Sequence, residues 1–165
     1  MKKAGLVCAL FLLAVSMSFS GGKAETGAAG GVEKLKIVVA SDATWPPMEF
    51  VNEQKEIVGF DVDLIRAVAE AGGFDVEIKN TAWDGIFAGL ANGAYDAVIS
   101  SVTITDERKQ TMDFSKPYIN AGQVLIVQTS NNTATTLKQM VGKKVGAQIG
   151  TTGAFEIEKV PGVEL

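Results

Sequence analysis

The chain has 165 residues, 47% of them hydrophobic and 21% charged, a composition typical of globular proteins. It has no histidine and one cysteine, Cys8, so histidine-based acid–base or triad catalysis is excluded and a zinc or other transition-metal site is not expected. With 15 basic and 19 acidic residues the net charge is −4, and an acidic chain without a basic stripe argues against nucleic-acid binding.

Residues 1–24 have the pattern of a cleavable signal peptide. Lys2 and Lys3 precede an almost unbroken apolar run, residues 6–15, and small residues follow it up to Ser20 and Ala24, after either of which cleavage is expected. The run is too short to span a membrane stably, and Cys8 stands too early in it for a lipid anchor. We therefore expect export to the periplasm or the extracellular space. Residues 25–34 form a flexible lead-in.

The next residues alternate between strand and helix patterns. A β-branched strand is expected first, then a small hairpin after the prolines at 46 and 47, and then helices that begin at Asp61 and Asp84. The predicted elements in order are strand 35–40, hairpin 50–58, helix 61–71, strand 76–79, helix 84–92 and strand 96–100. This βαβαβ order predicts an α/β fold with a parallel sheet flanked by helices. Asp61 and Asp63 are interpreted as helix-start residues rather than site residues.

The alternation of strand and helix begins again near residue 128. A strand at residues 123–128 is long enough to link two bodies, so we predict lobe one over 35–122, a hinge strand over 123–128 and a partial second lobe over 129–165. The partial lobe should contain a short helix capped by Thr136, a strand at 144–148 and a helix from about Ala154. One strand and one full helix are too little for an independent core, so a fragment or a truncated second lobe is expected.

The segment from Ser100 to Arg108 follows a buried strand, where ligands bind in α/β proteins. Hydroxyls and a guanidinium gathered there would suit a carboxylate, because arginine offers two parallel N–H donors to a planar anion. Alternatively, Thr105 N-caps a short helix and Arg108 is solvated. Taken alone, the segment favours the capped helix.

Six motifs that follow one another along the chain favour the carboxylate site over the capped helix. The chain carries Ala40-Ser41-Asp42 with Trp45, Gly59-Phe60-Asp61-Val62-Asp63, Trp83-Asp84-Gly85, Thr103-Ile104-Thr105-Asp106-Glu107-Arg108, Phe114-Ser115-Lys116-Pro117-Tyr118 and Gly146-Ala147-Gln148-Ile149-Gly150-Thr151-Thr152-Gly153. Together they resemble the bacterial extracellular solute-binding proteins of family 3, the polar amino-acid-binding family of ABC importers. The resemblance implies a two-lobed Venus-flytrap (periplasmic-binding-protein-like) fold with an amino acid in the cleft.

The resemblance also implies roles for residues at matching positions. Arg108 would grip the ligand carboxylate, together with Thr103 and, from lobe two, Thr151 and Thr152 at a helix N-terminus. Ser101 and Thr103 would contact the ligand ammonium. The side-chain pocket would contain Asp42, Trp45, Trp83 and Gln148, the tryptophans stacking on an aliphatic stem or a cation. Alternatively, the tryptophans are core aromatics, and Asp42 caps a turn. In family members an acid that holds the ammonium comes from a part of lobe two that has no counterpart here.

The predicted function is therefore binding of a polar or basic L-amino acid and its delivery to a membrane permease. An acid at position 42 disfavours glutamate and aspartate as ligands. We expect a monomer without a cofactor or catalytic residues, and the glycines at 146, 150 and 153 do not have nucleotide-binding spacing. Alternatives are an exported enzyme of the same fold, similar to cyclohexadienyl or arogenate dehydratase, and the sensing lobe of a receptor.

Overall fold

The computed structural model describes residues 34–131 and 133–165. The predicted signal peptide, residues 1–24, and residues 25–33 of the predicted lead-in lie outside the described residues. Within the described ranges, no helix is both long enough and apolar enough to cross a lipid bilayer.

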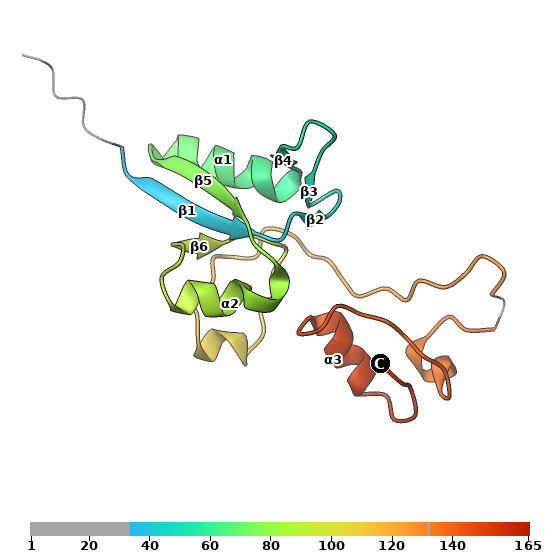
Figure 1. The fold of residues 1–165 in the computed structure, drawn as a ribbon. Helices are drawn as coiled ribbons and strands as arrows, with labels where there is room; N and C mark the ends of the chain where they lie inside the picture. The colour runs from blue at the N-terminus through green and yellow to red at the C-terminus, as the bar shows by residue number, and fades with distance from the viewer. Residues whose placement is uncertain (1–33, 132) are drawn as a thin grey trace, which may run out of the picture. The chain divides into compact units, whose positions relative to one another are not determined.

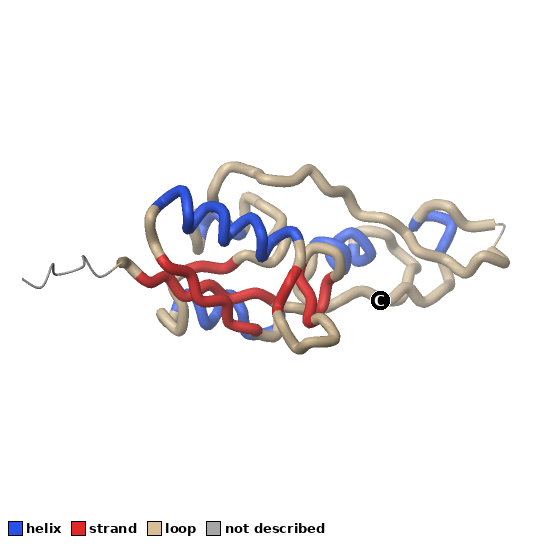
Figure 2. Tube along the Cα trace, turned by 90° about the horizontal axis from the view of Figure 1, so that it is seen from above, coloured by secondary structure: helices blue, strands red, loops and turns tan. Residues whose placement is uncertain are grey.

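A parallel three-stranded sheet forms the centre of the fold, as predicted. Its strands are β1 (Lys36–Ser41), β5 (Asp75–Asn80) and β6 (Ala97–Val98), in the spatial order β5-β1-β6. Strands β1 and β5 pair along their full length, while β6 pairs with β1 at Val39 and Ala40 only. Strand β6 is shorter than the predicted 96–100, and the Asp96 carboxylate accepts the Val38 N–H at 2.8 Å beside it. Figure 2 shows the strands together in red.

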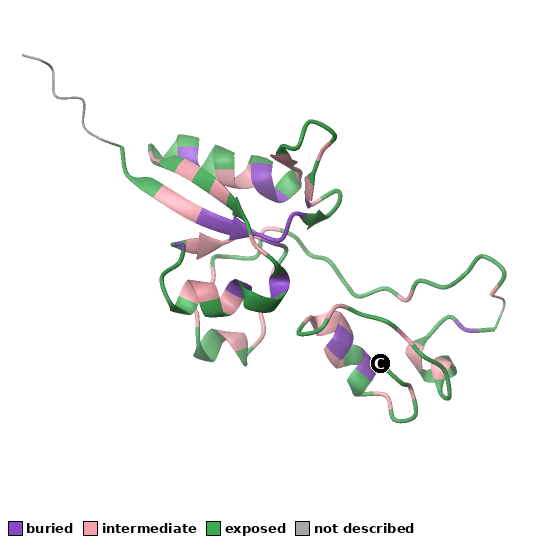
Figure 3. Ribbon diagram, viewed as in Figure 1, coloured by how far each residue is buried: buried purple, intermediate pink, exposed green. Residues whose placement is uncertain are grey.

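Two helices cover the sheet. Helix α1 (Phe60–Gly72) connects β1 to β5, and α2 (Trp83–Ala91) connects β5 to β6 on the other side of β1. Because parallel crossovers are right-handed, connections that run in opposite directions along a sheet place their helices on opposite faces, as Figure 1 shows. Helix α2 packs Trp83 and Ile86 against Ala40 and Tyr95 to form the buried core, and Figure 3 shows this burial around the end of β1.

A second, antiparallel sheet lies between β1 and α1 in the chain. It contains β2 (Thr44–Trp45), β3 (Glu49–Val51) and β4 (Ile57–Val58), in that order. Phe50 pairs with Val58 and Val51 with Ile57, which confirms the predicted hairpin. The sheet presents Trp45 and Glu49 beside the carboxyl end of β1.

Helix α1 begins differently from the prediction. Its N-cap is Gly59, with φ 128°, and Asp61 is a fully buried residue of the first turn. A Cβ at Gly59 would lie 2.6 Å from the carbonyl carbon of Met48 and 2.9 Å from the carbonyl oxygen of Pro47. Glycine is therefore needed for the close approach of β3 to the helix, and the predicted cap at Asp61 is wrong because Asp61 turns inward.

The segment after β6 contains less regular structure than predicted. Residues 123–127 form no strand, and Val124 and Ile126 are 81% and 87% exposed, because no described strand lies beside them to complete a ladder. The predicted strand at 144–148 is reduced to one bridge between Lys144 and Glu164. The predicted helices are confirmed as a 3₁₀ turn at Leu137–Met140, with a capping box from Thr136, and as α3 (Thr152–Glu158).

Candidate functional site

The carboxyl ends of β1 and β6 meet at the point where the strand order reverses. The chain leaves β1 toward α1 and enters β6 from α2, so the two connections diverge there. In open α/β sheets, ligands bind at such a switch point. Asp42 follows β1 and Ser100 follows β6, and the Asp42 N–H donates to Ser100 Oγ at 3.0 Å. The segment that begins at Ser100 therefore leaves the sheet at this switch point.

Ser101 adopts a conformation that few non-glycine residues adopt. Its φ is 47°, in the left-handed region. The Ser101 N–H donates to Asp61 Oδ2 at 2.7 Å, and its Oγ lies 3.2 Å from the same oxygen. Tyr118 also donates to Asp61 Oδ2, at 2.9 Å. Asp61 therefore holds the loop that follows β6, which is a role beyond the expected helix start.

Arg108 forms hydrogen bonds both through its backbone and through its guanidinium group. The Arg108 N–H donates to Thr105 Oγ1 at 3.2 Å, but the N-cap of the short 3₁₀ turn, Arg108–Gln110, is Glu107 and not the predicted Thr105. The guanidinium, however, is not simply solvated. It donates to the carbonyl oxygens of Thr103 at 2.8 Å and Gly150 at 3.1 Å. Since arginine has five N–H donors, these two bonds leave donors for an anion.

Aromatic rings lie under the guanidinium of Arg108. Its central carbon lies 5.6 Å from the ring centroid of Trp83 and 5.0 Å from that of Phe87, within the range of a cation–π contact. Burial lowers the pKa of Arg108, and the charge of Glu107 partly opposes this effect. Arginine nevertheless keeps its charge at physiological pH, so the site retains a cation.

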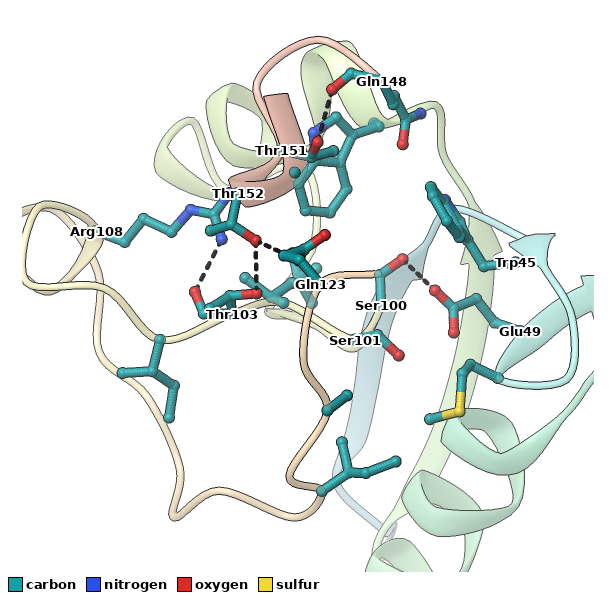
Figure 4. Close-up of a pocket in the computed structure, with 18 of the residues that line it drawn as sticks. Trp45, Glu49, Ser100, Ser101, Thr103, Arg108, Gln123, Gln148, Thr151 and Thr152 are labelled. Carbon is teal, nitrogen blue, oxygen red and sulfur yellow. Dashed lines mark hydrogen bonds between the residues drawn. The ribbon is translucent and has the colours of Figure 1, made fainter. Parts of the chain in front are cut away.

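Threonine hydroxyls surround the same position. Thr103 Oγ1 lies 3.2 Å from Thr152 Oγ1, and Gln123 Nε2 donates to Thr152 Oγ1 at 2.9 Å. Thr151 caps α3 by accepting the Ala154 N–H at 3.3 Å, and its hydroxyl donates to the Gln148 carbonyl at 2.7 Å. Figure 4 shows Thr103, Thr152 and Arg108 side by side. The residues predicted to bind the ligand carboxylate thus lie together, although their contact with a ligand remains a prediction.

The two tryptophans differ in their surroundings. Trp45, on β2, is 49% exposed, so it has a free ring surface. Trp83 is 8% exposed and belongs to the core, and its ring contacts Phe87 edge-on at 5.1 Å between centroids. Both rings line the pocket. Trp83 is therefore a core aromatic that also faces the site, while Trp45 has the more accessible surface for stacking.

Asp42 lies behind the pocket rather than in its wall. The other predicted site residues line the pocket, and Asp42 does not. Asp42 Oδ1 accepts from Thr44 Oγ1 at 2.9 Å, which is the turn contact considered as its alternative role. Its Oδ2 accepts from Gln148 Nε2 at 3.3 Å. Direct contact between Asp42 and a ligand side chain stays a prediction. Gln148, which is bound to Asp42, is the residue of this pair that lines the pocket.

Sequence reasoning missed several residues at this site. Phe87 lies in the predicted helix 84–92 and Gln123 in the predicted hinge strand 123–128, and neither was named as a site residue. Glu49 and Tyr118 were also given no role at the site. A signal for Glu49 was present, because an acid between the apolar residues Met48 and Phe50 is unusual in a strand.

Glu49 is fully buried and lies next to Ser100. The Ser100 hydroxyl donates to Glu49 Oε1 at 2.8 Å. Burial raises the pKa of Glu49 to about 8; the Ser100 hydrogen bond opposes this shift, and the nearby carboxylates of Asp61 and Asp42 add to it. Among residues 34–131 and 133–165, no three histidines, cysteines or acids are grouped so that they could hold a metal ion. These buried acids therefore need another explanation.

Comparison with known proteins agrees with this geometry. A probable histidine-binding protein of Neisseria gonorrhoeae is 41% identical over 163 residues, covering 97% of this chain and 60% of the relative. Among solved structures, an ancestral arginine-binding protein bound to arginine has a TM-score of 0.77 and 41% identity, covering 80% of this chain and 60% of the other. The ancestral amino acid-binding protein AncCDT-1, a precursor of cyclohexadienyl dehydratase, has a TM-score of 0.74 and 36% identity, covering 78% and 59%.

The chain spans about three fifths of the length of these relatives. The family model described as bacterial extracellular solute-binding proteins, family 3, matches residues 37–156. This match runs from β1 to the middle of α3 and includes the residues around Arg108. The chain therefore belongs to the bacterial extracellular solute-binding proteins of family 3.

Proposed function

We propose that the chain binds a polar or basic L-amino acid at the switch point of its sheet. The observation that carries the proposal is the convergence of Arg108 with the hydroxyls of Thr103 and Thr152 in one pocket. Arg108 would bind the ligand carboxylate through two parallel N–H groups. The Thr103 and Thr152 hydroxyls, with Thr151 beside them at the start of α3, would donate to the same group.

The side chain of the ligand would extend toward Trp45 and Gln148. Trp45 offers an exposed ring surface, and a cation over an indole gains about 0.5–2 kcal/mol depending on its desolvation. The Gln148 amide can donate or accept, and Asp42 behind it adds a negative charge. This combination favours arginine, lysine, histidine or glutamine. Two of the relatives described above support this range, since they are named for histidine and arginine.

The wider role would be that of the substrate-binding protein of an ABC importer. In this role the chain is exported by its signal peptide to the periplasm or the extracellular space, and acts as a monomer. It delivers the amino acid to a membrane permease and catalyses no reaction. Membership of an extracellular solute-binding family supports this role.

A dehydratase is the second candidate, and the likeness to AncCDT-1 is its support. That protein is itself described as an amino acid-binding protein. We therefore favour binding over catalysis. Formation of product from prephenate or arogenate by the chain would reverse this choice.

Isothermal titration with a panel of L-amino acids tests the proposal. We expect heat from a basic or polar amino acid and none from glutamate. Arg108→Lys should weaken binding about 10- to 100-fold, because lysine keeps the charge but loses the paired donors. Arg66→Lys is the matched control, since Arg66 is exposed on α1, and it should leave affinity unchanged. Equal effects of the two substitutions, or no binding by any member of the panel, would refute the proposal.

A further inference from the structure

Three carboxylates are buried together beside the site. Asp42, Glu49 and Asp61 are 4%, 0% and 0% exposed, and they come from the end of β1, from β3 and from α1. None of them forms an ion pair with a lysine or arginine of the described residues. Burial of unpaired charges is costly, and such groups commonly become neutral instead. At least one of these acids therefore has reason to hold a proton.

Glu49 and Asp61 each accept hydrogen bonds at only one of their two carboxylate oxygens. Glu49 Oε1 accepts from Ser100, and Asp61 Oδ2 accepts from Ser101 and from Tyr118. The remaining oxygens, Glu49 Oε2 and Asp61 Oδ1, are buried and have no partner if both acids are ionised. The two carboxyl groups are bound by adjacent residues, since Ser100 donates to Glu49 and Ser101 donates to Asp61, and the nearby Asp61 contributes to the raised pKa of Glu49. A proton on one acid would therefore satisfy both remaining oxygens.

We propose that Glu49 and Asp61 share one proton, carried on Glu49 Oε2 and donated to Asp61 Oδ1, and that this acid pair positions the Ser100–Ser101 loop for ligand binding. The second half of this statement rests on the proposed function. Glu49 and Asp61 act as positioning residues, because they contact the loop rather than the ligand.

The assignment of the proton to Glu49 follows from the donors around each acid. Asp61 Oδ2 accepts from one N–H and from the hydroxyls of Tyr118 and Ser101, so Asp61 already acts as an acceptor for three donors. Glu49 accepts from Ser100 alone. The titratable groups that face Glu49 are Asp61 on α1 and Asp42 after β1, with Tyr118 behind Asp61. Both facing acids disfavour a charge on Glu49.

The pair contacts both residues that leave β6. Ser100 donates to Glu49 and accepts the Asp42 N–H, so it ties the end of β6 to the end of β1. Asp61 binds the N–H of Ser101 in its left-handed conformation, which is strained for a residue other than glycine. If Glu49 lost its proton, two adjacent buried carboxylates would repel each other, and the loop that leads to Thr103 would shift.

Stability as a function of pH tests the shared proton. The folded chain keeps a proton that the unfolded chain releases near the ordinary pKa of 4.5, so raising the pH should favour unfolding. We expect the melting temperature of the wild type to fall by about 5 °C or more between pH 5 and 8 relative to Glu49→Gln, whose amide cannot titrate. Glu53→Gln, at an exposed position of the hairpin, is the matched control and should keep the wild-type profile.

Infrared spectroscopy detects the proton directly. We expect the wild type and Glu53→Gln to show the carbonyl stretch of a protonated carboxyl group at pH 7, and Glu49→Gln to lack it. The same pH profile and the same spectrum in Glu49→Gln and the wild type would overturn the shared proton.

Titration with L-arginine tests the positioning role. The affinity of the wild type should fall several-fold between pH 6.5 and 8.5, while Glu49→Gln should keep its affinity across this range. Affinity that falls equally in both chains would overturn the positioning role. Absence of arginine, lysine, histidine and glutamine binding at every pH, with the carboxyl signal intact, would refute the proposed function and the positioning role while confirming the shared proton.

Discussion

Substitution of Gly59 by alanine tests how tightly α1 is joined to the segment that carries Glu49. The new Cβ would lie 2.6 Å from the Met48 carbonyl carbon and 2.9 Å from the Pro47 carbonyl oxygen. These carbonyls accept the N–H groups of Asp61 at 2.9 Å and Phe60 at 3.1 Å. Alanine at φ 128° costs about 1–3 kcal/mol, and weakening two hydrogen bonds costs about 0.5–1.5 kcal/mol each. The expected loss of stability is about 2–6 kcal/mol.

Substitutions of two other glycines show how much of this loss of stability comes from the backbone conformation and how much from the contact with Met48 and Pro47. Gly73 also has a positive φ, 70°, but a Cβ there would meet nothing within 4 Å, so Gly73→Ala should cost only about 1–2 kcal/mol. Gly85 lies inside α2 with open space around it, and Gly85→Ala should stabilise the chain by about 0.5–1 kcal/mol. Urea unfolding at constant m-value measures all three. Equal losses for Gly59→Ala and Gly73→Ala would show that the contact with Met48 and Pro47 is unimportant.

Substitutions at four further positions test the site. Asp42→Asn should weaken binding of arginine about tenfold and hardly affect glutamine; equal losses in titrations with both amino acids would remove Asp42 from the side-chain pocket. Trp45→Ala should lower affinity without changing the urea midpoint, whereas Trp83→Ala should cost about 3–5 kcal/mol of stability. A larger loss of stability for Trp45→Ala than for Trp83→Ala would contradict the burial of these rings. Thr151→Ala should lower the helical signal of α3 with a cost of about 1 kcal/mol, while Thr151→Ser should retain it; similar circular dichroism spectra for the two variants would exclude the cap.

The central fold was predictable because its signals are local. Strands β1 and β5 are β-branched runs, and the helices between the strands carry regular apolar spacing, so their order alone indicates a parallel sheet. The prediction of a strand at 123–127 was wrong for a different reason. Apolar residues such as Val124 and Ile126 favour an extended chain, but a strand also needs a neighbour, and the described residues supply none.

The grouping of the candidate site residues could be expected from sequence motifs, and their contacts with a ligand stay predictions; the residues that hold them in place could not be identified in this way. Arg108 and Thr103 were identified from a motif, and the structure brings them into one pocket. Asp61 does lie in the first turn of α1, as predicted, although the N-cap is Gly59. Its contacts with Ser101 and Tyr118 were missed because the position of an acid near a helix start already explains it. Glu49 and Phe87 depend on contacts between distant segments, since Glu49 binds Ser100, 51 residues away, and Phe87 lies under Arg108, 21 residues away. No local pattern reveals such contacts.

The stacking of Arg108 on Trp83 and Phe87 has a consequence for the thermodynamics of association. A long side chain that becomes immobilised on binding loses rotamer entropy worth about 0.5–1.5 kcal/mol. Arg108 is already held by two carbonyl oxygens and two rings, so this loss occurs during folding rather than when a ligand arrives. An anion therefore meets an ordered guanidinium, and association can proceed without waiting for a side-chain rearrangement.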